Sequence, residues 1–405
     1  MPIKTRFLYP IVALGLLAAL AGPGRAQQPA LRTPPPEAVD LEGGENEPPP
    51  RAPEDLPELV PEDATAIKPL PPELPDRTRE LLGDTTTMLE IPLNQIPNYR
   101  DYMRMVIEDL SVYARKRDPN FTMVTFGGFD LLTWSQREYD LAELKRPETA
   151  APAAPETTVP VGYYMRRYNQ SINGFILDGF FCAPVRVPLV DLEAVRGQGL
   201  KTLSVDHCPP QSTAAAFAAA AQAGIVAHVD SDIEKRFDRI PAARPNPENP
   251  ESVVHLSDAK SMLVLLNNRG FDTKDKWLAT LQQTNFDVLV VDTFFNGNQA
   301  LTKKEVTMLK HKKLGSRRLV LAWLDVSHAI DGSYYWQRDW AVGNPSWINA
   351  IDPTRPGQYF VEFWNPAWKA IVGRTFAGIM DLGFDGVVLD GVEGYRRWEF
   401  ATPVN

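Results

Sequence analysis

Short apolar segments that end in an aspartate recur along this chain, and they constrain its fold more than any other feature. The last of them, Val387-Val388-Leu389, runs directly into Asp390. A short apolar run of this kind is typical of a strand that is buried on both faces of a parallel sheet. The segments of this type end at Asp178, Asp206, Asp230, Asp292, Asp325 and Asp390.

Segments with helical spacing lie between these strands. Residues 99–117, for example, place Met103, Val106 and Leu110 on one face of a helix, and a strand follows at residues 121–126. Strands that alternate with helices predict βαβ units and a parallel sheet. The predicted strands comprise residues 121–126, 172–177, 200–205, 225–229, 262–266, 288–291, 318–324 and 387–389, and the predicted helices comprise residues 99–117, 189–195, 213–223, 274–283, 303–311 and 366–382.

Eight strands are the number that closes a (β/α)8 TIM barrel of about 250 residues or more, and this is the α/β fold predicted here. The alternative is an open, doubly wound sheet, but no strand is followed by a glycine-rich nucleotide-binding turn. In a barrel the carboxyl ends of the strands converge on one mouth, where repulsion between crowded carboxylates raises some of their pKa values. One such aspartate is as well explained by capping of the next turn, so the hypothesis of a site rests on their number.

Three histidines lie close to the predicted strand ends, namely His207, His228 and His328. A histidine beside a strand-end aspartate can be a metal ligand, an acid or base, or a hydrogen-bond partner. The chain has no HxH or HExxH spacing. A metal site is therefore the less favoured interpretation, and we predict none.

The amino terminus has the pattern of a secretory signal peptide. Lys4 and Arg6 precede an apolar stretch at residues 11–22, and a small-x-small cleavage pattern ends at Ala26. We expect residues 1–26 to be removed, the mature protein to be periplasmic or secreted, and no membrane insertion after cleavage, because the stretch is too short for a mature anchor. Residues 27–80 are rich in Pro and Glu and predict a disordered linker, and residues 81–405 predict the folded domain.

The composition limits the kinds of ligand. The net charge of -9 argues against a nucleic-acid partner and suits a neutral or cationic ligand. Indole rings stack on the C–H faces of sugars, and we expect Trp336 and Trp340, in the loop after the strand at residues 318–324, to bind ligand. Trp364 and Trp368 precede or begin a predicted helix, and for these two we favour core packing.

Two cysteines, Cys182 and Cys208, are the only ones in the chain, and each follows a predicted strand. In an oxidising compartment they can form a disulfide that closes a loop of about 27 residues. The alternative is two free thiols.

Several motifs in the second half resemble the endo-α-1,4-polygalactosaminidase family of glycoside hydrolases. Residues 384–390, with Tyr395 and Trp398 beyond them, are similar to that family's signature. Further similar blocks are residues 287–292, 334–336, 344–347 and 361–368, so the resemblance covers the chain from Met262 to the end.

The first half resembles the same family in a different order. The Tyr113-Ala114-Arg115 run and the strand at residues 119–121 resemble family segments that follow the signature, yet they lie near the start of the domain. Residues 172–181, 200–207 and 215–232 resemble later segments of the family. The resemblance therefore implies a circularly permuted barrel, which is physically feasible because barrel termini lie close together at the surface.

The resemblance also implies a catalytic role for a pair of carboxylates. Asp390 matches one, and Asp178 stands where the family has a glutamate. Hydrolysis of a glycosidic bond needs one protonated and one ionised carboxyl group, which these two can supply without a cofactor. The expected reaction is endo-acting cleavage of an amino-sugar polysaccharide, with a cationic polymer as the partner. The predicted substrate-binding residues are Asp206, Asp230, Asp292, Asp325, His328, Glu393, Tyr395, Trp336 and Trp340.

Two departures from the family pattern leave other functions open. Residues 327–330 (SHAI) replace an acidic G-E-x-E motif, and residues 126–128 (FGG) replace a strand end in Gln-Asn. A carbohydrate-binding barrel without activity is one alternative. A metal-dependent hydrolase that uses the aspartates and histidines of the mouth is the other.

Overall fold

The computed structural model describes residues 91–146, 159–182, 189–232, 234–241, 244–245 and 247–404. The predicted signal peptide (1–26) and the predicted disordered linker (27–80) lie outside the described residues. Within the described part, no helix combines the length and the apolar character that crossing a membrane requires.

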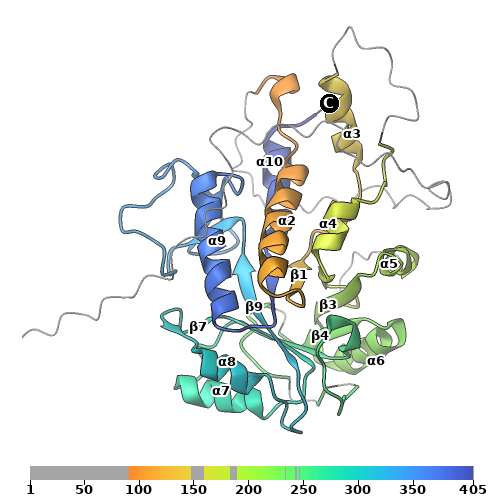
Figure 1. The fold of residues 1–405 in the computed structure, drawn as a ribbon, viewed down its shortest axis with the longest axis vertical. Coiled ribbons are helices and arrows are strands. Elements are labelled where there is room, and N and C mark those ends of the chain that lie inside the picture. The colour runs from red at the N-terminus through yellow and green to blue at the C-terminus, as the bar shows by residue number, and fades with distance from the viewer. Residues whose placement is uncertain are drawn as a thin grey trace, which may run out of the picture. The chain divides into compact units, whose positions relative to one another are not determined.

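Eight parallel strands form a nearly closed α/β barrel, as the sequence predicts (Figure 1). Their order around the barrel follows the chain, and the first strand pairs with the last. The two end strands of the sheet are linked by a side chain, since Val264 N–H donates to His228 Nδ1 at 3.4 Å. The strands are β1 (Thr122–Phe126), β2 (Gly174–Asp178), β3 (Lys201–His207), β4 (Val226–Asp230), β5 (Met262–Leu265), β6 (Val288–Val291), β9 (Leu319–Asp325) and β13 (Gly386–Asp390).

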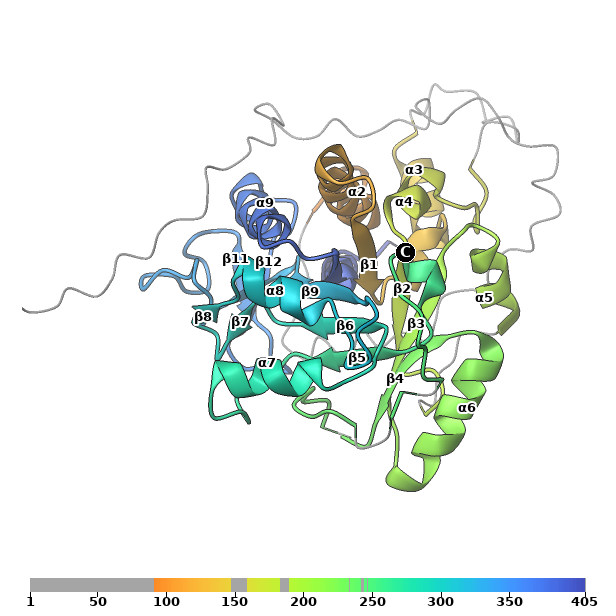
Figure 2. The same ribbon diagram turned by 60° about the horizontal axis from the view of Figure 1, so that its bottom comes forward.

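Helices lie around the strands, which Figure 2 shows from a second direction. The six predicted helices are all present. Of the described residues between β4 and β5, the 3₁₀ turn Leu256–Asp258 is the one helical element. The α-helices are α2 (Tyr99–Arg117), α3 (Gln136–Leu144), α4 (Arg166–Ser171), α5 (Leu189–Arg196), α6 (Thr213–Ala223), α7 (Lys274–Gln282), α8 (Lys303–Leu309), α9 (Pro366–Asp381) and α10 (Tyr395–Ala401).

Local sequence signals begin several of these helices. Ser135 and Glu138 form a capping box at the start of α3, and Thr302 and Glu305 do the same for α8. Each box satisfies backbone N–H groups of the first turn that have no partner within the helix. Asn365 caps α9, in which proline occupies the first position, where its missing N–H costs nothing.

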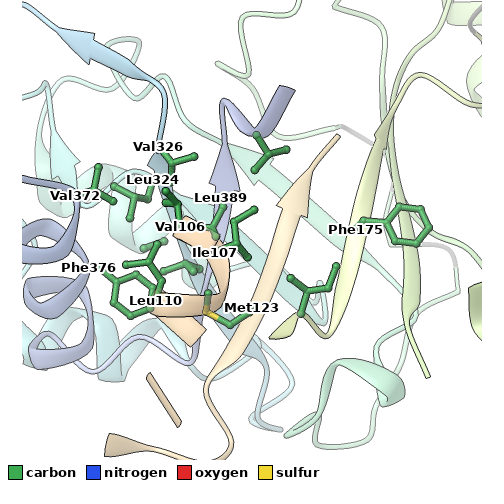
Figure 3. Packing of buried hydrophobic residues seen from close by; sticks show 14 of the residues in the cluster. Val106, Ile107, Leu110, Met123, Phe175, Leu324, Val326, Val372, Phe376 and Leu389 are labelled. Carbon is green, nitrogen blue, oxygen red and sulfur yellow. The ribbon is translucent and has the colours of Figure 1, made fainter. Parts of the chain in front are cut away.

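Alternating strand residues divide the core into two layers. Val124 and Val388 belong to a cluster inside the barrel, whereas their neighbours Met123 and Leu389 belong to the cluster between strands and helices. Side chains along a strand point alternately to the two faces, so the cluster membership assigns each position to the inside or the outside. Figure 3 shows the outer cluster, in which Val106, Ile107 and Leu110 of α2 and Val372 and Phe376 of α9 lie over Met123, Leu324 and Leu389.

Two small antiparallel sheets follow the carboxyl ends of barrel strands. The connection from β9 to α9 contains β10 (His328–Ile330), β11 (Ile348–Ile351) and β12 (Gln358–Val361). The connection from β6 to α8 contains the hairpin β7 (Phe294–Phe295) and β8 (Gln299–Ala300). Neither sheet was expected from the sequence. Both lie in connections that start at the barrel mouth. We use this term for the end of the barrel at which the carboxyl ends of the strands lie.

Candidate active site at the barrel mouth

Five of the six predicted strand-end aspartates point into the barrel mouth. Ile176, Val290 and Val388 belong to the inner cluster, and an aspartate stands two residues beyond each of them. Because side chains two residues apart on a strand share a face, these aspartates point inward as well. The same argument applies to the ends of β4 and β9. The inward-facing acids are Asp178, Asp230, Asp292, Asp325 and Asp390.

Asp206 is the exception, and its predicted role in substrate binding needs correction. Val205 belongs to the inner cluster, so the next residue faces out of the barrel. The Asp206 side chain is fully buried, and its Oδ1 accepts the backbone N–H groups of Phe180, Phe181 and Cys182 at 2.7, 2.6 and 3.1 Å. Asp206 therefore holds the loop after β2 in place and faces away from the mouth.

Asp390 and Asp325 are direct neighbours on adjacent strands, and they share one arginine. The two residues are paired in register on β13 and β9. Arg355, in the turn between β11 and β12, places Nη1 3.1 Å from Asp390 Oδ2 and 3.5 Å from Asp325 Oδ2. Asp325 also contacts His328 Nδ1 at 3.0 Å, and Asp352 lies 3.7 Å from the other ring nitrogen of that histidine. Three carboxylates, a guanidinium and an imidazole thus form one cluster.

The pKa values of the two carboxyl groups shift in opposite directions. Burial raises the pKa of Asp390, and the negative charge of Asp325 adds to this effect, while Arg355 opposes it. Burial alone would also raise the pKa of Asp325, but His328 and Arg355 outweigh it, so the pKa of Asp325 is lowered. The pKa of Asp390 therefore lies above that of Asp325, and Asp390 is the member of the pair that holds a proton more readily.

Asp178, the second predicted catalytic residue, opens on the same mouth from β2. The single strand β1 separates β2 from β13, which puts the two backbones roughly 10 Å apart at the usual spacing of strands. Lys235, in the connection after β4, lies 2.9 and 3.0 Å from the two carboxylate oxygens of Asp178. The structure thus brings Asp178 and Asp390 to one opening but gives each a cationic partner.

Glu393 lies against the two glycines that follow β1, Gly127 and Gly128. Gly128 N–H donates to Glu393 Oε1 at 3.1 Å, and a Cβ on Gly127 would lie 3.0 Å from the same carboxyl group. Burial raises the pKa of Glu393, and the charge of Asp178 contributes. Tyr395, by contrast, is fully buried and donates its hydroxyl to Asp130 at 2.6 Å, so it serves packing rather than ligand contact.

The remaining two inward acids have different surroundings. Asp230 accepts hydrogen bonds from His207 and His228, and these bonds lower its pKa although burial alone would raise it. Asp292 accepts the N–H of Phe294 at 2.9 Å and has no ion pair among the described residues. Burial raises the pKa of Asp292 to about 6. An uncompensated carboxyl of this kind is suited to proton transfer near neutral pH.

Aromatic rings of the connection between β9 and α9 pack together against the outer cluster. Trp336 stacks on Tyr359 with ring centres 4.8 Å apart, and Trp340 meets Trp347 edge to face at 5.0 Å. Trp336 and Trp340 are half-buried, so part of each ring faces solvent. Trp368 is buried in the outer cluster, as predicted. Trp364 is only partly buried and packs against this cluster.

Three residues that contact the site were not identified from the sequence, namely Lys235, Arg355 and Phe237. All three lie in long connections, where no periodicity indicates the direction of a side chain. Phe237 packs on the inner cluster together with Trp323, an aromatic residue that the sequence does place around the mouth, and their ring centres are 6.5 Å apart.

A disulfide joins Cys182 and Cys208, the first of the two alternatives considered for these residues. It links the loop after β2 to the end of β3. In the described part of the chain, no three His, Cys, Asp or Glu side chains are arranged to hold a metal ion.

Comparison with known proteins gives relatives without assigned functions. The chain is 27% identical over 157 residues to an uncharacterized protein of Thermotoga maritima (36% of this chain, 47% of the relative). It is 28% identical over 153 residues to an uncharacterized protein of Methanocaldococcus jannaschii (38% and 43%), and 32% identical over 120 residues to one of Deinococcus radiodurans (30% and 37%). The chain thus spans less than half the length of these relatives. No protein-family model matches it.

Proposed function

We propose that this protein is a glycoside hydrolase that cleaves an amino-sugar polysaccharide internally, in the manner of the polygalactosaminidase family. The observation that carries the proposal is the pair formed by Asp390 and Asp325, whose pKa values shift in opposite directions. A buried carboxyl group whose pKa is raised, with a negative neighbour that adds to the effect, is suited to be the general acid of glycoside cleavage. The resemblance of the motifs points to the same class.

Each carboxyl group then has a distinct task. Asp390 is the protonated acid that gives its proton to the leaving oxygen, and ionised Asp325 beside it keeps that proton on Asp390. Asp178 faces the substrate from β2 and acts as nucleophile or base. Arg355 neutralises part of the charge that builds up when Asp390 loses its proton.

The chemistry of the mouth favours a cationic substrate. The five inward acids face one opening, and the chain as a whole carries a net charge of -9. Such an opening attracts ammonium groups, which a polymer of free galactosamine carries on every residue. Trp336 and Trp340 supply faces on which further sugar rings can stack.

The test is a comparison of Asp390→Asn with the parent protein on a de-acetylated α-1,4-galactosamine polymer. We expect the parent to release oligosaccharides and Asp390→Asn to lose at least about 10²-fold in rate, because it lacks the proton to donate. Asp339→Asn is the matched control, since Asp339 is an exposed carboxylate in the loop after β10. Turnover that survives in Asp390→Asn would refute the assignment.

We also infer that the barrel is circularly permuted. Three observations support this inference. The two strands at the ends of the sheet, β4 and β5, are consecutive in mid-chain, whereas the first and last strands, β1 and β13, pair with each other. The connection between β4 and β5 also lacks an α-helix among its described residues. The connection has the character of a linker between former ends. A permuted chain has two segments in the opposite order from its relatives, and an alignment that keeps the residue order can match only one of them. Matches that cover less than half of each relative are therefore expected.

A secreted or periplasmic location is part of the proposal. The disulfide between Cys182 and Cys208 supports it, because disulfides persist in oxidising compartments and are rare in the cytosol. The signal-peptide pattern of residues 1–26 agrees with such a location.

A second candidate function is carbohydrate binding without hydrolysis. Both proposed catalytic carboxylates are engaged by cations of the chain itself, Asp178 by Lys235 and Asp390 by Arg355. A protein of this kind would bind the galactosamine polymer and release no product. Binding of the parent protein to the polymer, measured together with product analysis, separates the two functions.

A further inference from the structure

His207 is an inward-facing residue of the mouth that the catalytic proposal does not use. It is the last residue of β3, two positions beyond Val205 of the inner cluster. Its side chain is 5% exposed, and its Nδ1 lies 2.7 Å from Asp230 Oδ1. Its other ring nitrogen, Nε2, is buried and has no hydrogen-bond partner among the described residues.

The hydrogen bonds around Asp230 define which nitrogen of His207 carries the proton. Val264 N–H donates to His228 Nδ1, so the proton of neutral His228 lies on Nε2, which points to Asp230 Oδ2 at 3.3 Å. Asp230, as a carboxylate, accepts only, and therefore His207 donates from Nδ1 to Oδ1. The lone pair of neutral His207 then lies on Nε2.

The His207 ring is held from two sides. Asp230 fixes Nδ1, and the Phe237 ring packs edge to face against the imidazole with centres 5.1 Å apart. Phe237 is itself fixed, since its carbonyl accepts the N–H groups of Leu266 and Asn267, both at 3.1 Å. An acceptor whose direction is set in this way is suited to recognise one donor of a ligand.

We propose that His207 Nε2 is a ligand-binding acceptor of the barrel mouth, which takes a hydrogen bond from a hydroxyl or ammonium group of a bound sugar. The assignment deepens the proposed function, on which the choice of ligand rests. His207 lies on the side of the mouth formed by β3 and β4, whereas Asp325 and Asp390 lie on the side formed by β9 and β13. A sugar ring between the two sides meets His207 on one side and the catalytic acids on the other.

Phe237 is the aromatic ring in contact with His207. Its half-buried ring contacts both His207 and, across the mouth, Trp323 at 6.5 Å. We expect a ligand that binds Nε2 to displace this ring. Phe237→Ala is expected to tighten ligand binding, and that gain is expected to vanish when His207 is also changed.

The primary test observes the nitrogen itself. Protein with ¹⁵N-labelled histidine is titrated with oligomers of α-1,4-linked galactosamine, with His207→Phe used to assign the resonance. We expect the Nε2 resonance of His207 to move on binding, as a nitrogen that gains a hydrogen bond does. Neutral galactose oligomers form the second arm: a shift with both oligomers identifies a hydroxyl donor, and a shift with galactosamine alone identifies an ammonium donor.

Affinities give the second readout. His207→Phe keeps the ring but removes the acceptor, and it should weaken binding about five- to tenfold, the amount expected for one hydrogen bond. His207→Gln offers a carbonyl oxygen at about the place of Nε2 and should restore much of the loss. An unmoved Nε2 resonance with bound oligomer, or equal affinity of His207→Phe and parent, overturns the proposal. A shifted resonance without sugar cleavage overturns hydrolysis alone.

Discussion

Lys235 and Asp178 form a two-pronged ion pair across the barrel mouth, with the ammonium 2.9 and 3.0 Å from the two carboxylate oxygens. Lys235 belongs to the connection between β4 and β5 and has a left-handed backbone, φ 53°. In the proposed function, its ammonium lies where an amino group of a cationic sugar would bind Asp178. The chain thus presents its own cation to a proposed catalytic carboxylate.

Replacing Lys235 by methionine is therefore expected to favour ligand binding. The variant leaves Asp178 without its cation, and galactosamine oligomers should bind about three- to tenfold more tightly, as measured by calorimetry. Stability should change by less than about 1 kcal/mol, because the side chains of the pair are 47% and 34% exposed and such pairs contribute little.

Lys276→Met is the matched control for this variant. Lys276 forms an ion pair with Asp272 on the exposed side of α7, where the side chains are 63% and 76% exposed. Lys276→Met should alter the net charge by the same amount as Lys235→Met and leave the affinity for galactosamine oligomers unchanged. Equal effects of the two substitutions would assign the gain to net charge and not to Asp178.

The pKa of Asp292 predicts a specific dependence of stability on pH. Its folded-state pKa of about 6 lies above the ordinary value of 3.8, so between these values the folded state holds a proton that the unfolded state has lost. Stability due to this group is therefore fully present below about pH 4 and is lost as pH rises through 6. The difference between these two pKa values corresponds to about 3 kcal/mol of stability as an upper limit.

Asp292→Asn removes this dependence. Relative to the parent, the variant should be more stable by up to about 3 kcal/mol at pH 7.5 and nearly equal at pH 4, measured by urea unfolding. Asp339→Asn, in an exposed loop, controls for the loss of one carboxylate. A difference between Asp292→Asn and parent that is independent of pH would contradict the raised pKa.

The barrel was predictable because its strands carry a strong local signal. A strand buried on both faces needs consecutive apolar residues, and the run at residues 387–389 supplies them without any information from distant parts of the chain. The capping box of α3 was equally readable in Ser135 and Glu138 and was missed. Strands and helix caps that depend only on neighbouring residues can therefore be predicted from the sequence.

The direction in which each side chain points also has to be predicted, and for β3 the sequence prediction chose the wrong residue. It placed Asp206 in the mouth, where the structure has His207. The run at residues 203–207 ends in both an acid and a histidine, and only the alternation from Val205 shows that Asp206 faces out and His207 faces in. Arg355 and Lys235 could not be predicted in this way. They reach their partners from irregular connections, whose paths depend on the packing of the whole domain.

The disulfide is expected to contribute measurably to stability. Cys182 and Cys208 are 26 residues apart, and closing a loop of that length stabilises a fold by about 3 kcal/mol in the chain-entropy model. The Cys182→Ser/Cys208→Ser variant should be destabilised by about this amount in urea unfolding. A reducing agent should destabilise the parent similarly and leave the variant unchanged; an effect of reductant on both would point to a cause other than this bond.

A substitution at Gly391 tests whether Asp325 controls the proton on Asp390. It follows Asp390 with φ +74°, and a Cβ there would collide with Asp325 Oδ1 and lie 2.5 Å from Ser327 Oγ. Gly391→Ala should push the Asp325 carboxylate away from Asp390, lower the pKa of Asp390 and reduce turnover of the galactosamine polymer by about 10²-fold, the size of a typical acid-base contribution. The pH profile of the remaining activity should move to lower pH.

Gly297→Ala is the control that isolates the backbone effect. Gly297 has nearly the same φ, +73°, but no atom lies within 4 Å of a Cβ placed there among the described residues. Both substitutions incur the cost of a left-handed alanine, about 1 kcal/mol, and should lower stability by similar amounts from this cause. Only Gly391→Ala should change the pH profile. If Gly297→Ala shifted it as well, or if Gly391→Ala lost stability and kept full turnover, Asp325 would not be the group that controls the proton on Asp390.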